Sequence, residues 1–150
     1  MKILFEGSKE LSYTLLEVSN AIANIGLYFV GTTRNMPDMT SVVLVEQGPK
    51  FVTFKTNEGL VKRTNIDIRI ADERISVEYA EEYWAGKHIA AISHVMDVFT
   101  PGQTGVEHSI TISGVEAPGF GRFFTRSLDV PGLGEALLAA QHAHIEAQVG

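Results

Sequence analysis

The chain has 150 residues, with 12 Lys or Arg against 18 Asp or Glu, and so a formal net charge of −6. This length favours a single domain over residues 1–150, and 45% hydrophobic with 20% charged residues is typical of a globular chain rather than a disordered one. The acidic balance argues against nucleic acid as a partner, because phosphate binding needs clustered cations. The absence of Cys excludes disulfides and thiolate chemistry.

The N-terminal stretch does not resemble a targeting segment. Met1 to Gly7 holds one cation and only three consecutive apolar residues, which does not fit a signal peptide. No apolar run approaches the ~20 residues of a membrane span. We therefore expect a cytoplasmic protein without a membrane span.

The first forty residues predict a short strand and then helix. Lys2–Phe5 predicts the strand, and Ser12 is a suitable N-cap for a helix with near-helical apolar spacing. Gly26 is expected to interrupt this helix. Residues 27–30 fit helix or strand, and residues 31–40 predict a loop.

From residue 41 the hydrophobic period changes to two, which predicts strands. The separators are short and rich in turn residues, which favours hairpins and an antiparallel meander. With the first strand, about seven strands are expected. The six in this part of the chain are Ser41–Gln47, Phe51–Asn57, Leu60–Ile70, Arg74–Trp84, His88–Phe99 and Val106–Ser113.

The hairpin loops set a register, which decides the face on which each side chain lies. Loops at Asp72-Glu73, Ala85-Gly86 and Gly102 give one apolar face across the last four strands. In this register Ile66 and Ile92 both oppose Tyr79. The remaining predicted pairs are Ile70 with Ile75, Ile68 and His94 with Val77, Ile112 with Ile92, Ile110 with His94, and His108 with Met96. The opposite face carries polar residues that include Asn65, Asp67, Ser93 and Asp97.

The end of the chain predicts helix. Residues 134–149 are Ala-rich, and Phe120, Phe124 and Leu128 follow one another at helical spacing. Pro131 and Gly132 lie between the two segments, so we expect one kinked helix or two helices in line. A long helix against one apolar sheet face gives a two-layer α+β domain.

This order of elements, together with several local motifs, resembles the SRPBCC or START-like superfamily, whose fold is the helix-grip. Residues 99–106, FTPGQTGV, look like the family's hairpin between strands six and seven. Ile112-Ser113-Gly114, with Gly119 to Phe124 after it, looks like the entry into the last helix. Residues 5–16 are similar to polyketide cyclase-like members and to members related to a component of carbon monoxide dehydrogenase.

The resemblance implies an antiparallel sheet of about seven strands curved around a long C-terminal helix. A short helical pair would follow the first strand, and a cavity would lie between sheet and C-terminal helix. Members bind lipids, steroids, polyketides or quinones there, and some are cyclases or dehydratases. We therefore expect a binder of a hydrophobic small molecule. A cyclase or dehydratase, and a non-enzymatic assembly or interaction protein, are the alternatives, and a homodimer stays open.

His94 and His108 are the sharpest candidates for chemistry. Both face inward in the predicted register, where an imidazole could hydrogen-bond a ligand carbonyl or move a proton near pH 7. Each alone is more often a core histidine bonded to a neighbour. If both faced a cavity, function would be favoured, because polar groups in an apolar wall are costly without partners.

The other polar candidates have plainer explanations. Tyr79 and Tyr83 could hold a ligand's polar end, although inward aromatic residues are usually core. Glu81 has the same inward parity and could be a cavity carboxylate, although we expect the strand to bend or bulge there and bring it to solvent. Arg122 and Arg126 could pair with an anionic ligand at the end of the cavity, although a solvated helix face is expected for them.

No metal or cofactor motif is present, so we expect neither a metal nor a cofactor. His94 and His108 would be the catalytic candidates in an enzyme. The expected ligand-binding residues are Ile66, Ile68, Val77, Tyr79, Tyr83, Ile92, His94, Met96, His108, Ile110, Phe124 and Leu128.

Overall fold

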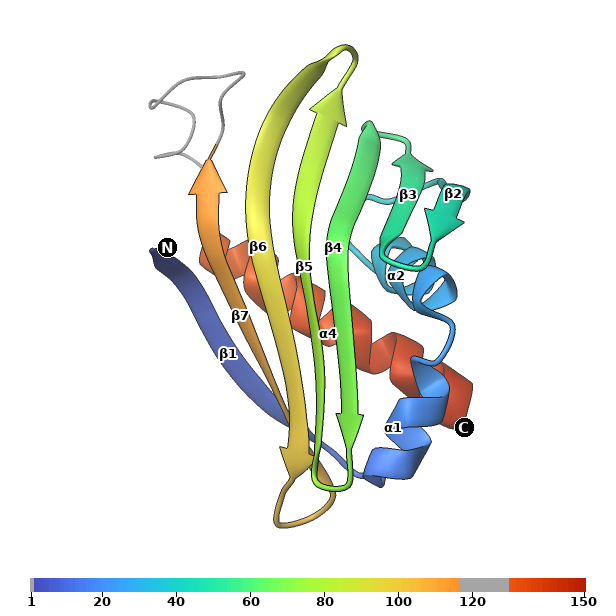
Figure 1. Cartoon of the computed structure of the whole chain (residues 1–150), viewed down its shortest axis with the longest axis vertical. Coiled ribbons are helices and arrows are strands. Elements are labelled where there is room, and N and C mark those ends of the chain that lie inside the picture. Colours follow the sequence, from blue (N-terminus) through green and yellow to red (C-terminus); the bar gives the residue numbers. More distant parts are fainter. Residues whose placement is uncertain (1, 117–129) are drawn as a thin grey trace.

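The period-two segments form an antiparallel sheet, and the helical segments pack on its concave face (Figure 1). The computed structural model describes residues 2–116 and 130–150, and in them the sheet has seven strands in the order β1-β7-β6-β5-β4-β3-β2. The strands are β1 (Ile3–Leu11), β2 (Val42–Gly48), β3 (Phe51–Thr56), β4 (Leu60–Ala71), β5 (Arg74–Ala85), β6 (His88–Pro101) and β7 (Val106–Glu116). The helices are α1 (Leu15–Ala21), α2 (Ile25–Arg34) and α4 (Val130–Val149).

The two short helices are set by their caps. Thr14, not Ser12, caps α1: its hydroxyl accepts from the Glu17 amide, and the Glu17 carboxylate accepts from the Thr14 amide. Asn24 caps α2, so the break comes before Gly26 rather than at it. Residues 27–30 are helical, and α2 continues to Arg34 into the predicted loop.

A β-bulge in β4 decides which side chains of that strand face the helices. The Asp72-Glu73 hairpin has the predicted register, with Ile70 opposite Ile75 and Ile68 opposite Val77. Beyond Asp67 the register shifts by one residue at Asn65, whose φ is 53°. This shift turns Arg63 onto the concave face, opposite Glu81, and leaves Ile66 within the bulge instead of opposite Tyr79.

The predicted face of β6 is wrong. Ala85 pairs with His88 across a turn in which Gly86 has a φ of +63°, and a further register shift follows near Ala90. As a result Tyr79 lies opposite Val95, three residues beyond the predicted Ile92. An odd shift inverts a strand, so His94 and Met96 point to the outer face.

A second shift of three residues restores the predicted face of β7. The β6–β7 hairpin closes with Pro101 opposite Val106, so Phe99 rather than Met96 lies opposite His108. Two odd shifts cancel, and His108, Ile110 and Ile112 face inward as expected. Only the strand between the two hairpins is inverted, and its inward residues are Val95, Asp97 and Phe99.

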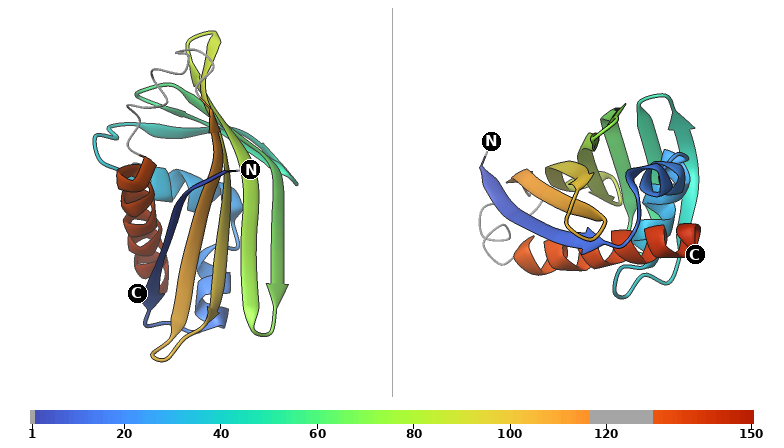
Figure 2. Two further views of the ribbon diagram at one scale, coloured as in Figure 1. Left: turned by 90° about the vertical axis from the view of Figure 1, so that its left-hand side faces the viewer. Right: turned by 90° about the horizontal axis from the view of Figure 1, so that it is seen from below.

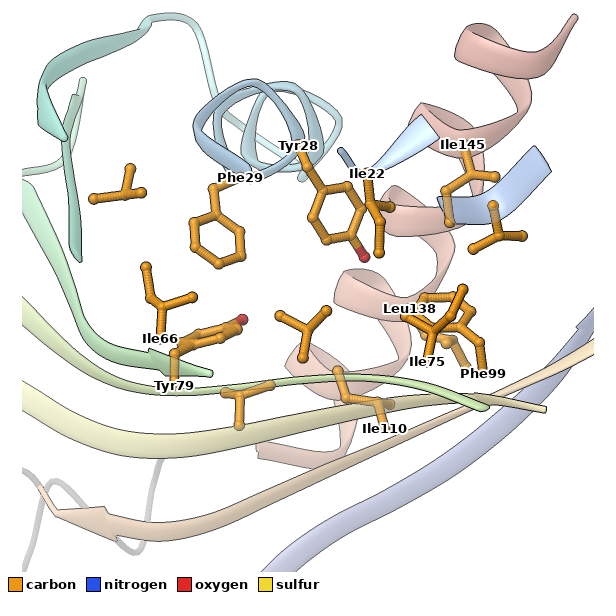
Figure 3. Packing of buried hydrophobic residues seen from close by; sticks show 14 of the residues in the cluster. Ile22, Tyr28, Phe29, Ile66, Ile75, Tyr79, Phe99, Ile110, Leu138 and Ile145 are labelled. Carbon is orange, nitrogen blue, oxygen red and sulfur yellow. The ribbon is translucent and has the colours of Figure 1, made fainter. Parts of the chain in front are cut away.

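The C-terminal helix α4 crosses the concave face of the sheet, and α1 and α2 lie beside it (Figure 2). Pro131 falls in the first turn of α4, where a missing amide is tolerated. The segment 120–128, where a preceding helical segment was expected, lies outside the described residues. Figure 3 shows the core between the layers, where Tyr28 and Phe29 from α2 and Leu138 from α4 meet sheet residues such as Tyr79.

The expected fold class is confirmed: an α+β arrangement with a curved antiparallel sheet, a short helical pair after the first strand and a C-terminal helix. None of the helices that the structure describes is both long and apolar enough to span a membrane.

The bulge at Asn65 gives a test of this geometry. A positive φ suits Gly and Asn but strains a β-branched residue. Asn65→Gly should leave the free energy of unfolding unchanged or raise it slightly, whereas Asn65→Val should lower it by about 1–2 kcal/mol. Urea denaturation measures both. Equal stability of the two variants would contradict the left-handed conformation at this position.

Candidate functional site

A cavity of about 520 Å³ lies between the sheet and the helices. Its walls come from β3 to β7, from residues in and after α2, and from the first turns of α4. Most of the lining is apolar. Four of its polar side chains lie on β4 and β5, and the others are Thr33, Thr56, Glu58 and Ser93. The part of the wall around the polar groups of β4 and β5 includes Val61, Arg63, Tyr79, Glu81, Tyr83 and Ala91.

Arg63 is the most unusual residue of this lining because its charged side chain is only 7% exposed. Its guanidinium lies 4.4 Å from the ring centre of Phe29 and 4.7 Å from that of Tyr79, an arrangement that favours a cation. Its Nε donates to Oε1 of Glu81 at 2.9 Å. The fold therefore holds a positive charge at the wall of an apolar space.

The electrostatic surroundings fix the charge states of this wall. Burial by itself would lower the pKa of Arg63, but the fields of Tyr79, Glu81 and Asp97 outweigh it and raise the pKa above its ordinary value. Burial also raises the pKa of the Tyr79 phenol well above its usual range. At neutral pH Arg63 is thus a cation and Tyr79 a neutral hydroxyl.

A second polar group lies deeper, between β6, β7 and α4. The carboxylate of Asp97 and the ring of His108 are both fully buried, with Oδ1 and Nε2 2.7 Å apart. Nδ1 of His108 lies 2.9 Å from Nε2 of His142, and Nε2 of Gln141 donates to Asp97 at 3.1 Å. We call these four residues the Asp–His–His–Gln cluster; it joins α4 to the sheet, and its members do not line the cavity.

Hydrogen bonds and ring stacking fix the orientation of the side chains in this cluster. Oδ1 of Asp97 accepts from Nε2 of His108, so Nδ1 of that ring faces Nε2 of His142, with one nitrogen donating and the other accepting. His108 stacks on Phe99 with ring centres 4.1 Å apart. Burial, followed by the charges of His108 and Lys9, lowers the pKa of His142 to about 4.

The structure distributes the sequence-predicted site residues over four environments. Tyr79, Tyr83 and Ile92 line the cavity. Ile66, Val77 and Ile110 are buried in the core without lining it, and Ile68 is 37% exposed. Phe124 and Leu128, like Arg122 and Arg126, lie outside the described residues.

The two histidines singled out from the sequence are not brought together. His94 lies on the outer face, where Nε2 is 3.0 Å from Oε1 of Glu78, because β6 is inverted. Met96 shares that face. His108 points inward as predicted, but α4 covers it and its ring nitrogens are both taken. Among the described residues that line the cavity there is no histidine.

Glu81 corrects another expectation. It does not bend to solvent; it lines the cavity, 25% exposed, and binds Arg63. Sequence reasoning missed Arg63 and Asp97 because strict alternation puts both on the polar face. Asn65, a residue that tolerates positive φ, is the one sequence signal for the bulge that admits Arg63. In the described part of the chain, no three or more His, Cys, Asp or Glu side chains are arranged so that they could hold a metal ion.

Several solved structures share this architecture at low sequence identity. No family model and no curated protein matches the chain. A Chromobacterium violaceum protein superposes with a TM-score of 0.65 at 12% identity, covering 97% of this chain and 95% of its own. A STAR-related lipid transfer protein fragment from Xanthomonas axonopodis gives 0.60 at 14% identity, covering 94% and 84%.

A third likeness is the di-domain ARO/CYC protein BexL, with a TM-score of 0.51 at 14% identity. The match covers 95% of this chain and 49% of that one. At such identities the likenesses show the fold, and the chain has the helix-grip fold that its sequence led us to expect.

The low pKa of His142 predicts how stability depends on pH. The unfolded chain protonates this ring near 6.5, whereas the folded protein does so only near 4. Unfolding therefore becomes easier as the pH falls from 6.5 to about 4, and the contribution of His142 is constant below that. Between pH 6.5 and 4, the free energy of unfolding of His142→Gln should fall by roughly 2 kcal/mol less than that of the wild type.

Urea denaturation at several pH values measures this slope. His88→Gln, the same change at the exposed first residue of β6, is the control and should keep the wild-type slope. Equal slopes for the wild type and His142→Gln would show that His142 protonates alike in the folded and unfolded chain.

Proposed function

We propose that this protein binds an apolar small molecule in the cavity between the sheet and the helices. The cavity itself is the main support: its volume of about 520 Å³ falls within the range of small-molecule sites, and its wall is apolar with a few polar side chains. Burial of a ligand's apolar surface would supply about 25 cal/mol per Å², before the cost of ordering the ligand.

The neighbouring structures support the same class of function. One is described as a lipid transfer protein and another as an ARO/CYC protein, and this chain shares their fold. We propose that binding of a hydrophobic molecule is the property that this chain shares with these two proteins.

Binding is favoured over proton-transfer catalysis by the placement of the histidines. An acid–base histidine must come within hydrogen-bond reach of the substrate. His94 lies on the outer face, and His108 is enclosed with both nitrogens partnered. A cavity of this size also counts against a purely structural interaction protein, whose interior we would expect to be fully packed.

Filling the cavity tests the proposal. Ala91→Phe places a ring on the cavity wall, and Ala80→Phe makes the same change on the outer face of the neighbouring strand. Wild-type protein and Ala80→Phe should bind the neutral dye Nile red with a blue-shifted emission, and Ala91→Phe should bind it at least tenfold more weakly. Fluorescence titration measures this, with circular dichroism to show that both variants fold.

Native mass spectrometry of the purified full chain is the second readout. A mass excess that disappears on denaturation, and that Ala91→Phe lacks, would support an internal ligand. Equal dye affinity of all three proteins would place binding elsewhere and sink the proposal.

A further inference from the structure

We propose that the cavity selects an uncharged carbonyl compound with an apolar body, and that Arg63 holds the carbonyl oxygen. This inference rests on the proposed function, because it concerns the polar end of a ligand in the same cavity. It comes from two features of the wall: hydrogen-bond donors without acceptors, and a positive charge that is already neutralised.

The unused donors belong to the Arg63 guanidinium. An arginine side chain has five N–H groups, and Nε of Arg63 uses one of them on Glu81. Within residues 2–116 and 130–150, no hydrogen bond joins its two terminal nitrogens to another residue. A side chain that is only 7% exposed and lines the cavity therefore offers donors that a ligand oxygen can satisfy. An acceptor at this point gains more than it would at the surface, because the surrounding wall is largely apolar and a hydrogen bond is stronger in such a medium.

The neighbouring Tyr79 offers one more donor to the same region. Its ring lies beside the guanidinium, and its phenol is neutral at physiological pH. No hydrogen bond joins the Tyr79 hydroxyl to another described residue. A carbonyl oxygen has two lone pairs and no proton of its own, which matches a wall of donors.

The charge balance argues against a carboxylate. Glu81 is 2.9 Å from Arg63 and cancels its charge, Asp97 adds a negative field at Arg63, and Glu58 also lines the cavity. A ligand anion would therefore meet one compensated cation among several carboxylates, and would be repelled in a medium that screens charges poorly. The wall donates hydrogen bonds without offering a net positive charge.

This arrangement makes Glu81 the residue that excludes anions. Arg63 alone would favour a carboxylate, which accepts two parallel bonds from a guanidinium. With Glu81 present, the same guanidinium should favour a neutral oxygen. Removing the charge of Glu81 while keeping its shape should therefore reverse the preference.

Displacement of Nile red by three ligands with hydrocarbon chains of similar length tests the proposal. The ligands are methyl nonyl ketone, decanoic acid at neutral pH, and undecane. Wild-type protein should bind the ketone at least tenfold more tightly than decanoate. Glu81→Gln should bring decanoate level with the ketone or ahead of it. Arg63→Met should weaken ketone binding by roughly tenfold, to the level of undecane.

Glu82→Gln is the matched control, because it removes the same charge from the adjacent residue of β5. Glu82 pairs with Trp84 rather than with Arg63. The Glu82→Gln variant should prefer the ketone over decanoate as strongly as the wild type does. A matching reversal in Glu82→Gln would mean that net charge, and not the Arg63–Glu81 pair, sets the selectivity.

A measurement on wild-type protein keeps the proposal testable even if a variant fails to fold. The carbonyl stretch of isotope-labelled methyl nonyl ketone should move to lower frequency in the complex than in an alkane solvent. An unshifted band, or tighter binding of decanoate than of the ketone by the wild type, would overturn the inference while leaving cavity binding intact. If none of the three ligands displaced the dye, and Ala91→Phe bound the dye as tightly as the wild type, the result would instead count against the proposed function.

Discussion

Two charged side chains, Arg63 and Asp97, are buried on the largely apolar concave face of the sheet, and their neutralisation organises the interior. A buried charge is tolerated only when partners compensate for the loss of water. Asp97 receives bonds from His108 and Gln141 and is covered by α4. Arg63 has one carboxylate partner and aromatic rings around it, and it borders open space. All the compensation of Asp97 comes from groups that hold α4 in place, whereas Arg63 keeps donors that border the open cavity.

The sequence predicted the layers well and the polar interior poorly, and the reason is the bulges. Alternation gave the strands, and the two hairpin errors on either side of β6 cancelled, so the faces of β5 and β7 are as expected. Within β6 and beyond Asn65 in β4, a shift by an odd number of residues exchanges the two faces. Arg63, Asp97 and His94 are the residues whose roles changed, and each lies on a shifted stretch.

The same bulges have a structural purpose. An extra residue bends a strand and increases its twist, which lets a long sheet wrap around a helix. The shifts near Asn65 and Ala90 therefore belong to the curvature that creates the cavity, and Ala90 lines it. Strict alternation of inward and outward residues would describe a flatter sheet, and such a sheet would not enclose this space. Curvature and the inward turn of Arg63 thus have one cause.

The two charged sites lie one helical turn apart along α4. Leu137 lines the cavity, and Gln141, four residues later, donates to Asp97. The Asp–His–His–Gln cluster thus fixes the later turns of α4 against β6 and β7, while the earlier turns are free to serve as a cavity wall. A helix packed by apolar contacts alone would gain by collapsing into the open space, since filling a void restores lost dispersion contacts. Directional hydrogen bonds to a buried carboxylate oppose that movement, because α4 cannot shift toward the cavity without breaking them. The buried histidine pair is therefore best understood as what holds the cavity open, and in the proposed function the contacts to a ligand fall to Arg63, Glu81 and Tyr79.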